Sequence, residues 1–177
     1  MITDKELKNE FNRFKLGIRS NIMTSRFSND TWLENRSYIM RNDSIKCIYC
    51  SPDPIRNDIA KNSIMFILEM NNSDNKIMGI GMVRNSAVCG KYKVYSKENY
   101  NRFVYAGNKR IDREELDDDE ELIIKVFEDL CFKGSKHMKR GQGIKAFPLK
   151  ILFDCNKELN INLVEKVSNM FKNRLRK

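Results

Sequence analysis

Apolar positions in the N-terminal part of the chain recur with the period of amphipathic helices. In residues 3–18, apolar side chains lie at i, i+4 and i+7 from Leu7. Thr3 is followed three residues later by a glutamate, which is the capping-box pattern of a helix start. A second, shorter helix is predicted for residues 30–40, and the polar, basic residues 19–26 are predicted to form a connector.

The middle of the chain carries the shorter apolar runs and turn residues that are typical of β-strands. Residues 63–70 and 76–84 are strongly apolar, and an Asn-rich turn at residues 71–75 separates them. This pattern predicts a β-hairpin. Shorter strands are predicted on both sides of the hairpin and nearer the C-terminus, at residues 45–50, 91–96, 102–105 and 146–149.

Helical periodicity returns in the C-terminal part of the chain. Residues 112–132 are predicted to form a helix with Asp112 as its N-cap, because acidic residues fill its first turns. A basic terminal helix is predicted for residues 162–176. Because no repeat or long linker interrupts the pattern, residues 1–177 are predicted to form one α+β domain, with helices flanking a mixed or antiparallel sheet or small β-barrel.

The charge distribution narrows the class of partner. The formal net charge is +9 and the pI is about 9.3, which favours a polyanion, with RNA preferred to DNA, over a membrane surface. Residues 133–150 contain no glutamate and no aspartate, whereas residues 112–121 are strongly acidic. Such a basic loop suits phosphate contacts, although a merely solvated loop has the same composition. The predicted phosphate-binding residues are Lys133, Lys136, Lys139, Arg140, Gln142 and Lys145.

Two glycines make the second hairpin strand the most informative segment. Gly79 and Gly81 alternate with apolar residues and therefore lie on one face of the strand. Their missing side chains leave room for a flat ligand, or for a crossing strand or bulge. No third glycine follows and no helix opens here, so this is not a dinucleotide-binding motif.

This hairpin resembles the centre of PUA-like domains, notably those of the EVE and YTH families, through the run KIMGIGMV at residues 76–83. Residues 139–143 (KRGQG) and 147–149 (FPL) are similar to the basic ending of EVE domains. The acidic helix and the terminal helix depart from the minimal pattern. The resemblance implies a small β-barrel, flanked by helices, that reads a modified base in a pocket. YTH members hold N6-methyladenine in an aromatic cage, and EVE members are associated with modified cytosines. The abundance of Asn, Lys and Ile also resembles proteins of large DNA viruses.

A base-binding pocket needs aromatic faces and a few hydrogen-bonding groups. Aromatic residues occur just before and on the first predicted strand, and again in a cluster between Tyr95 and Tyr105. A lone Trp is also typical of a core anchor, and the tyrosines also suit core positions. The predicted base-binding residues are Trp32, Tyr38, Tyr49, Ser51, Gly79 and Gly81.

Few residues suggest catalysis or metal binding. Cys47 and Cys50 form a single CxxC, and in a strand they point to opposite faces, so neither a metal nor a cofactor is predicted. The alternative to a binding domain is an enzyme like the ASCH relatives of these families, which are amidohydrolases acting on acetylated cytidine. The one pair we nominate for such chemistry is Glu69 with a nearby lysine. A third possibility is a packaging or scaffold protein that binds nucleic acid through charge alone.

The remaining sequence features concern location. The first residues are polar and lack the apolar core of a signal peptide, and no apolar run reaches the length of a membrane span. The number of cysteines is odd and their spacing irregular, which favours reduced thiols. We therefore expect an intracellular, non-catalytic nucleic-acid-binding domain, a reader of a modified base, with no membrane partner.

Overall fold

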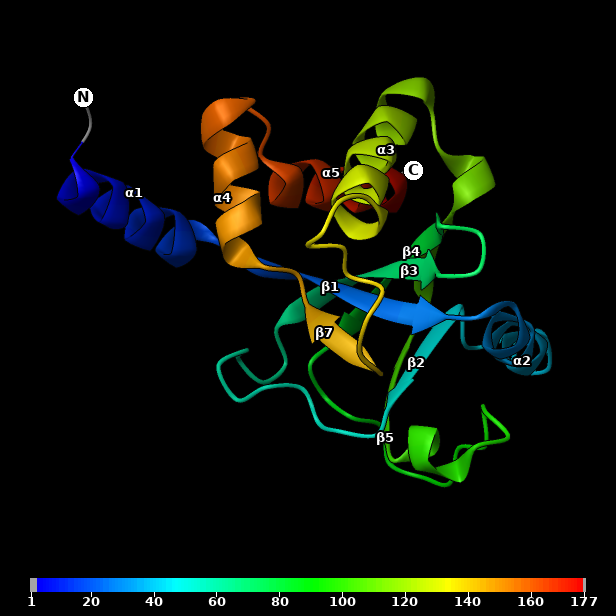
Figure 1. Ribbon diagram of the computed structural model, residues 1–177. Coiled ribbons are helices and arrows are strands. Elements are labelled where there is room, and N and C mark those ends of the chain that lie inside the picture. Colours follow the sequence, from blue (N-terminus) through cyan, green and yellow to red (C-terminus); the bar gives the residue numbers. More distant parts are fainter. Residues whose placement is uncertain (1–2, 177) are drawn as a thin grey trace.

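A five-stranded mixed sheet forms the centre of the protein, described by a computed structural model for residues 3–176 (Figure 1). The strand order is β6-β4-β3-β1-β7, and a separate two-stranded ribbon pairs β2 with β5. Only β1 and β3 pair in parallel, and the other ladders in the described residues are antiparallel. The strands are β1 (Ser20–Phe27), β2 (Cys47–Ser51), β3 (Ile64–Asn71), β4 (Lys76–Arg84), β5 (Phe103–Gly107), β6 (Lys109–Asp112) and β7 (Ile144–Ala146).

The helices begin at side-chain caps that the sequence supplies. Thr3 and Glu6 form the predicted capping box of α1, and Ser28 and Asp117 cap α2 and α3 in the same way. Each cap satisfies backbone N–H groups that have no partner within the first helical turn. The helices are α1 (Asp4–Gly17), α2 (Asn29–Met40), α3 (Asp118–Phe132), α4 (Leu149–Glu158) and α5 (Leu163–Leu175), with short 3₁₀ turns at Glu98–Asn101 and Arg113–Glu115.

One face of the sheet is covered by α3, α4 and α5, which lie above it in Figure 1. Phe66 and Leu68 of β3 point to this side, as their alternation along the strand requires. They pack against apolar side chains of the helices, among them Phe127 and Phe171. Aromatic contacts reinforce the layer, since the rings of Phe66 and Phe171 stack with their centroids 5.0 Å apart.

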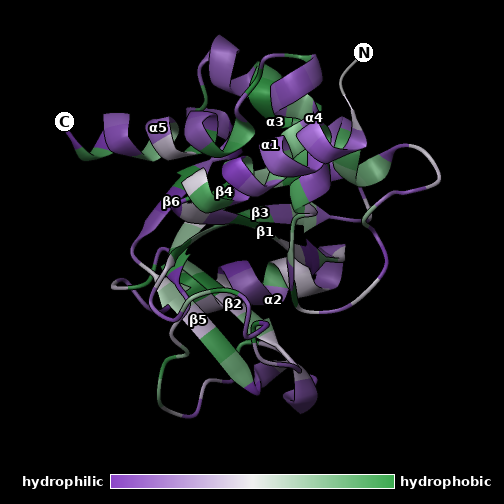
Figure 2. Cartoon of the chain, turned by 90° about the vertical axis from the view of Figure 1, so that its left-hand side faces the viewer, coloured by the Kyte–Doolittle hydropathy of each residue, from purple (hydrophilic) through white to green (hydrophobic). Residues whose placement is uncertain are grey.

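The other face packs against the β2–β5 ribbon and α2. Met65 and Ile67 alternate with the helix-facing residues and contact Tyr49 and Tyr105 of the ribbon. Figure 2 shows hydrophobic residues along the ribbon strands, whereas the helices carry hydrophilic residues on their outer sides. The molecule therefore has a helical layer, a central sheet, and a layer made of the ribbon and α2.

The α+β class is confirmed, but a closed barrel is not. Within residues 3–176, no ladder joins the ribbon to the five-stranded sheet. The ribbon approaches the sheet at both of its edges without pairing: Cys47 lies beside the Met82 carbonyl of β4, and Ser51 lies against Gly143 just before β7. The predicted hairpin of β3 and β4 is confirmed, with Ile64 opposite Arg84 and a bulge between Leu68 and Met70.

The prediction of a connector at residues 19–26 was wrong, because these residues form most of β1 in the middle of the sheet. A strand paired on both sides is buried on both faces, so it need not alternate between polar and apolar residues. Thr24 and Ser25 are buried here, and the Thr24 hydroxyl donates a hydrogen bond to the Lys145 carbonyl. Polar residues that are satisfied internally thus made a central strand look like a surface loop.

Several element boundaries also differ from prediction. Residues 91–96 form no strand, and β6 and α4 were missed. Asp112 caps the short 3₁₀ turn rather than a long helix, and α3 begins only after a second cap at Asp117. The strand predicted at residues 146–149 ends at Ala146, because Pro148 already precedes the first turn of α4. Within the described part of the chain, no helix has the length and apolar composition needed to cross a membrane.

Candidate nucleic-acid interface

A cavity of about 420 Å³ opens where the parallel strands β1 and β3 end. Its walls come from the end of β1 and start of α2, from the segment before and within the 3₁₀ turn at Glu98–Asn101, and from the loop that precedes β7. The carboxyl ends of parallel strands are a common place for ligands in mixed sheets. The volume lies within the usual range for small-molecule sites. The lining residues used below are Arg26, Asp30, Glu34, Asn72, Tyr95, Tyr100, Gly141 and Gln142.

Two tyrosines supply the aromatic wall of this cavity. The rings of Tyr95 and Tyr100 lie 6.3 Å apart in an edge-to-face arrangement. Asn101 holds this segment in place by accepting hydrogen bonds from the backbone N–H groups of Val94 and Tyr95. Asn35 donates a hydrogen bond to the Tyr95 hydroxyl, and burial raises the pKa of Tyr95, so this phenol stays neutral. A fixed aromatic wall of this kind offers a stacking face to a base.

Arg26 and Asn72 connect the cavity to the basic loop. The Arg26 Nε donates a hydrogen bond of 2.6 Å to the Met138 carbonyl, and the Asn72 amide donates one of 2.9 Å to the Lys139 carbonyl. Arg26 Nη1 and Asn72 Oδ1 are buried and have no hydrogen-bond partner in residues 3–176. Burial lowers the pKa of Arg26. The two side chains thus fix the loop and leave hydrogen-bonding capacity unused.

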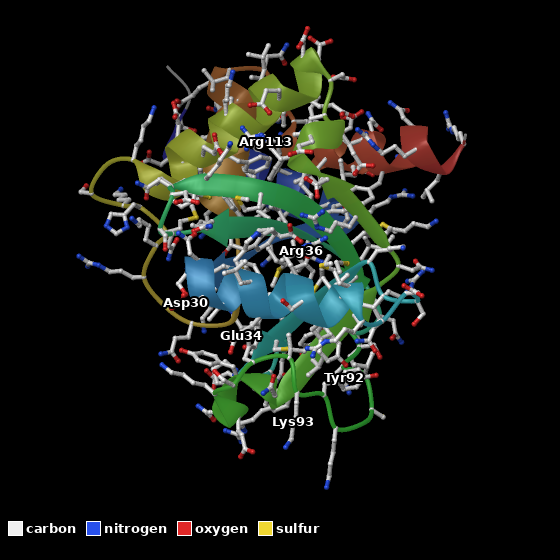
Figure 3. The ribbon with its side chains drawn as sticks, turned by 90° about the vertical axis from the view of Figure 1, so that its right-hand side faces the viewer. Asp30, Glu34, Arg36, Tyr92, Lys93 and Arg113 are labelled. Carbon is white, nitrogen blue, oxygen red and sulfur yellow. The ribbon has the colours of Figure 1, made fainter. Side chains whose placement is uncertain are left out.

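The first turns of α2 add two carboxylates to the cavity. Asp30 lies in the first turn, and Glu34 lies one turn further on. The backbone N–H of Ser96 donates a hydrogen bond of 3.1 Å to the Glu34 carboxylate, which ties α2 to the aromatic wall. Figure 3 shows Glu34 and Arg36 on opposite sides of α2. The side of α2 that carries Glu34 therefore belongs to the cavity wall.

The basic loop itself forms the third wall. Gly141 and Gly143 have φ values of 98° and 65°, a conformation that favours glycine. Gly141 and Gln142 line the cavity, and the flanking Arg140 is exposed. Lys139 is half-buried, and its ammonium donates a hydrogen bond to Asn75 rather than to a carboxylate. The loop thus brings free cations to the rim of an aromatic-lined cavity.

Not every predicted phosphate-binding residue is free of carboxylates. Lys133 is ion-paired with Asp129 of α3, and Lys150, at the end of the basic segment, is ion-paired with Asp154 of α4. The adjoining helices supply these carboxylates, so the segment's own sequence did not reveal them. Lys136, Arg140 and Lys145 are exposed and form no salt bridge in the described residues.

The space left by Gly79 and Gly81 is filled by the protein itself. A Cβ on Gly81 would collide with the Tyr49 hydroxyl and lie 2.7 Å from its Cζ. A Cβ on Gly79 would lie 2.7 Å from the Arg110 guanidinium and 2.9 Å from the Glu69 carboxylate. The glycines therefore admit a crossing ribbon strand and a buried ion pair, and the structure shows no open slot for a flat ligand there.

The other predicted pocket residues also lie outside the cavity. Tyr49 is fully buried, and its hydroxyl donates a hydrogen bond of 2.7 Å to Glu69. Trp32 packs edge-to-face on Phe27, with the guanidinium groups of Arg36 and Arg110 over its ring. Tyr38 packs against the apolar cluster between α2 and the ribbon, and Ser51 is buried beside Gly143. These residues support the cavity from behind and do not form it.

The pair nominated for amidohydrolase chemistry is not formed with a lysine. Glu69 is 1% exposed, and its carboxylate accepts a bidentate pair of hydrogen bonds from Arg110. Burial alone would lower the pKa of Arg110, but the charges and hydrogen bonds of Glu69 and Asp112 raise it. Burial also raises the pKa of Cys47 and of Cys50 to about 12. The residues of the described chain contain no cluster of potential metal ligands.

Sequence reasoning missed Tyr95 and Tyr100 as the aromatic wall and Arg26, Asp30, Glu34 and Asn72 as polar lining. The signal available was the aromatic cluster after residue 94, since each polar residue was hidden in a segment read as connector, helix surface or turn. In comparisons with protein-family models, with curated proteins and with solved structures, the chain matches none of them.

Proposed function

We propose that this protein is a non-catalytic nucleic-acid-binding domain that takes one base into the cavity beside the basic loop. The observation that carries the proposal is the sharing of one loop by two features. Gly141 and Gln142 line an aromatic-walled cavity, and the adjacent Lys139 and Arg140 are cations without a carboxylate partner. A base in the cavity would place its own phosphates close to these cations.

The division of labour follows from the chemistry of the two parts. Phosphate contacts through cations give affinity without sequence information. A single-stranded nucleotide can turn its base out of the stack, and a tyrosine face then stabilises it by about 1–3 kcal/mol. The partner is therefore a single-stranded or locally opened nucleic acid, with RNA preferred. The PUA-like, base-reading role implied by the hairpin resemblance belongs to this proposal.

The experiment is a binding titration of short single-stranded oligonucleotides by fluorescence anisotropy at several salt concentrations. Tyr100→Ala should weaken binding by about 1–3 kcal/mol. Lys139→Glu with Arg140→Glu should weaken binding to every sequence and flatten the dependence of affinity on salt. The matched control is Lys5→Glu with Lys8→Glu, which makes the same charge change on exposed positions of α1 outside the cavity lining.

The outcomes separate the proposal from binding through charge alone. If the α1 control weakens binding as much as the loop reversal and Tyr100→Ala has no effect, only the net charge matters. If the unmodified protein binds no oligonucleotide at low salt, the proposal is wrong. Thermal unfolding of each variant checks that the fold is retained.

A further inference from the structure

Arg26 is a partly buried cation whose charge the protein does not neutralise. No aspartate or glutamate of residues 3–176 lies within salt-bridge distance of its guanidinium. Its only recorded hydrogen bond goes from Nε to the Met138 carbonyl, and Nη1 has no partner. Burying an uncompensated charge costs free energy, so the site is electrostatically incomplete without a ligand.

The incompleteness is concentrated at the cavity. Arg26 Nη1 and Asn72 Oδ1 are two of the three buried side-chain atoms left without a partner in the described chain, and both residues line this cavity. The third atom, Arg36 Nη1, belongs to a residue that lines a different groove. A cation attracts carbonyl and ring-nitrogen acceptors over several ångströms, even where one of its N–H groups is itself covered.

A second wall of the same cavity offers the opposite chemistry. Asp30 and Glu34 of α2 present carboxylates, which accept hydrogen bonds and attract N–H donors. A phosphate group is therefore disfavoured inside the cavity, although it is favoured at the basic rim. The ligand that fits has acceptors on one edge and N–H donors on another.

We infer that the base bound in this cavity is guanine, an inference that rests on the proposed function. Guanine presents O6 and N7 as adjacent acceptors, which a guanidinium recognises. It also presents N1–H and the N2 amino group as adjacent donors, which suit one carboxylate. Adenine and cytosine offer a single amino donor, and uracil offers a single imino donor, so each leaves one wall less satisfied. Arg26 and Glu34 are the residues assigned to the acceptor and donor edges.

The test measures the affinity of oligonucleotides that are identical except for one central base. Guanine should bind about tenfold or more tightly than adenine, cytosine or uracil, since one good bidentate contact discriminates by at least this factor. Inosine, which lacks the N2 amino group, should fall between guanine and adenine. Arg26→Met and Glu34→Gln should each remove most of the preference for guanine while leaving the salt dependence unchanged.

Arg36→Met is the matched control, because Arg36 also has a buried, unpaired Nη1 but does not line this cavity. It should keep the preference for guanine. Arg26→Met should also unfold at the same temperature as the unmodified protein or a higher one, because it removes an uncompensated charge. Loss of selectivity without loss of stability is not expected of a residue that only supports the fold.

Two kinds of failure are distinguishable. If no oligonucleotide binds, the proposed function fails. If oligonucleotides bind with dependence on Tyr100 but adenine, uracil, N6-methyladenine or a modified cytosine binds more tightly than guanine, the inference about guanine alone is overturned. Retention of the guanine preference by Arg26→Met would overturn it as well.

Discussion

The two faces of the five-stranded sheet are stabilised by different means. The face under α3, α4 and α5 is closed by an apolar cluster that includes Leu68, Ile124 and Phe127. The face under the ribbon and α2 combines apolar packing with a buried ion pair between Glu69 and Arg110. The candidate cavity opens on the second side, beside these polar groups. Apolar packing can thus close one face, while the polar face contains the charges and glycines that shape the site.

The largest expected difference between the faces comes from breaking the buried ion pair. Arg110→Met leaves the Glu69 carboxylate, which is 1% exposed, without its cation. We expect the free energy of unfolding to fall by about 3–5 kcal/mol, because an unpaired buried charge is costly. Adding Glu69→Gln should recover much of the loss, since the unpaired charge is then removed. Chemical denaturation measures both changes.

The matched control for this prediction is Arg56→Met. Arg56 also pairs with an aspartate, but its side chain is 75% exposed. Exposed pairs contribute at most about 1 kcal/mol. An equal loss in Arg110→Met and Arg56→Met would mean that burial of the pair does not distinguish the two sites.

A smaller effect is expected from filling the space at Gly81. In Gly81→Ala the new methyl group meets the Tyr49 ring, with Cζ 2.7 Å away. Overpacking of this kind costs about 1–3 kcal/mol. Tyr49→Phe in the same chain should recover part of the loss, because it removes the hydroxyl but not the ring. Thermal unfolding measures the series.

Gly17→Ala provides the control, since nothing lies within 4 Å of a Cβ at this position at the end of α1. It should leave stability unchanged or raise it by up to about 1 kcal/mol. If Gly81→Ala behaves like Gly17→Ala, the ribbon lies further from β4 than the structure indicates.

Much of the fold could be predicted from periodicity and capping, and the reasons for the failures are physical. The β3–β4 hairpin and α1 follow from patterns that local sequence encodes. The central strand β1 could not be recognised, because Thr24 and Ser25 are buried only through their pairing with distant strands. The site was harder to predict. The glycine pattern on β4 correctly indicated a close approach, but the sequence does not show that Tyr49 and Arg110 occupy the space.

The smallest effect concerns the charges on the helical side, which lie at its rim. A side-chain hydrogen bond from Arg113 lowers the pKa of Glu121 below its ordinary value of 4.5. A carboxylate with a lowered pKa stabilises the folded state above its unfolded pKa, and this contribution is lost as the pH falls through the folded pKa. Because the Glu121 side chain is 30% exposed, solvent screening limits the contribution to at most about 1 kcal/mol. Glu121→Gln should therefore lower the free energy of unfolding slightly at neutral pH and have no effect near pH 3, where the carboxylate is protonated. Urea denaturation at both pH values measures this difference. A loss that grows toward acid, or that matches the loss in Arg110→Met, would contradict the view that only the polar face depends on a buried charge.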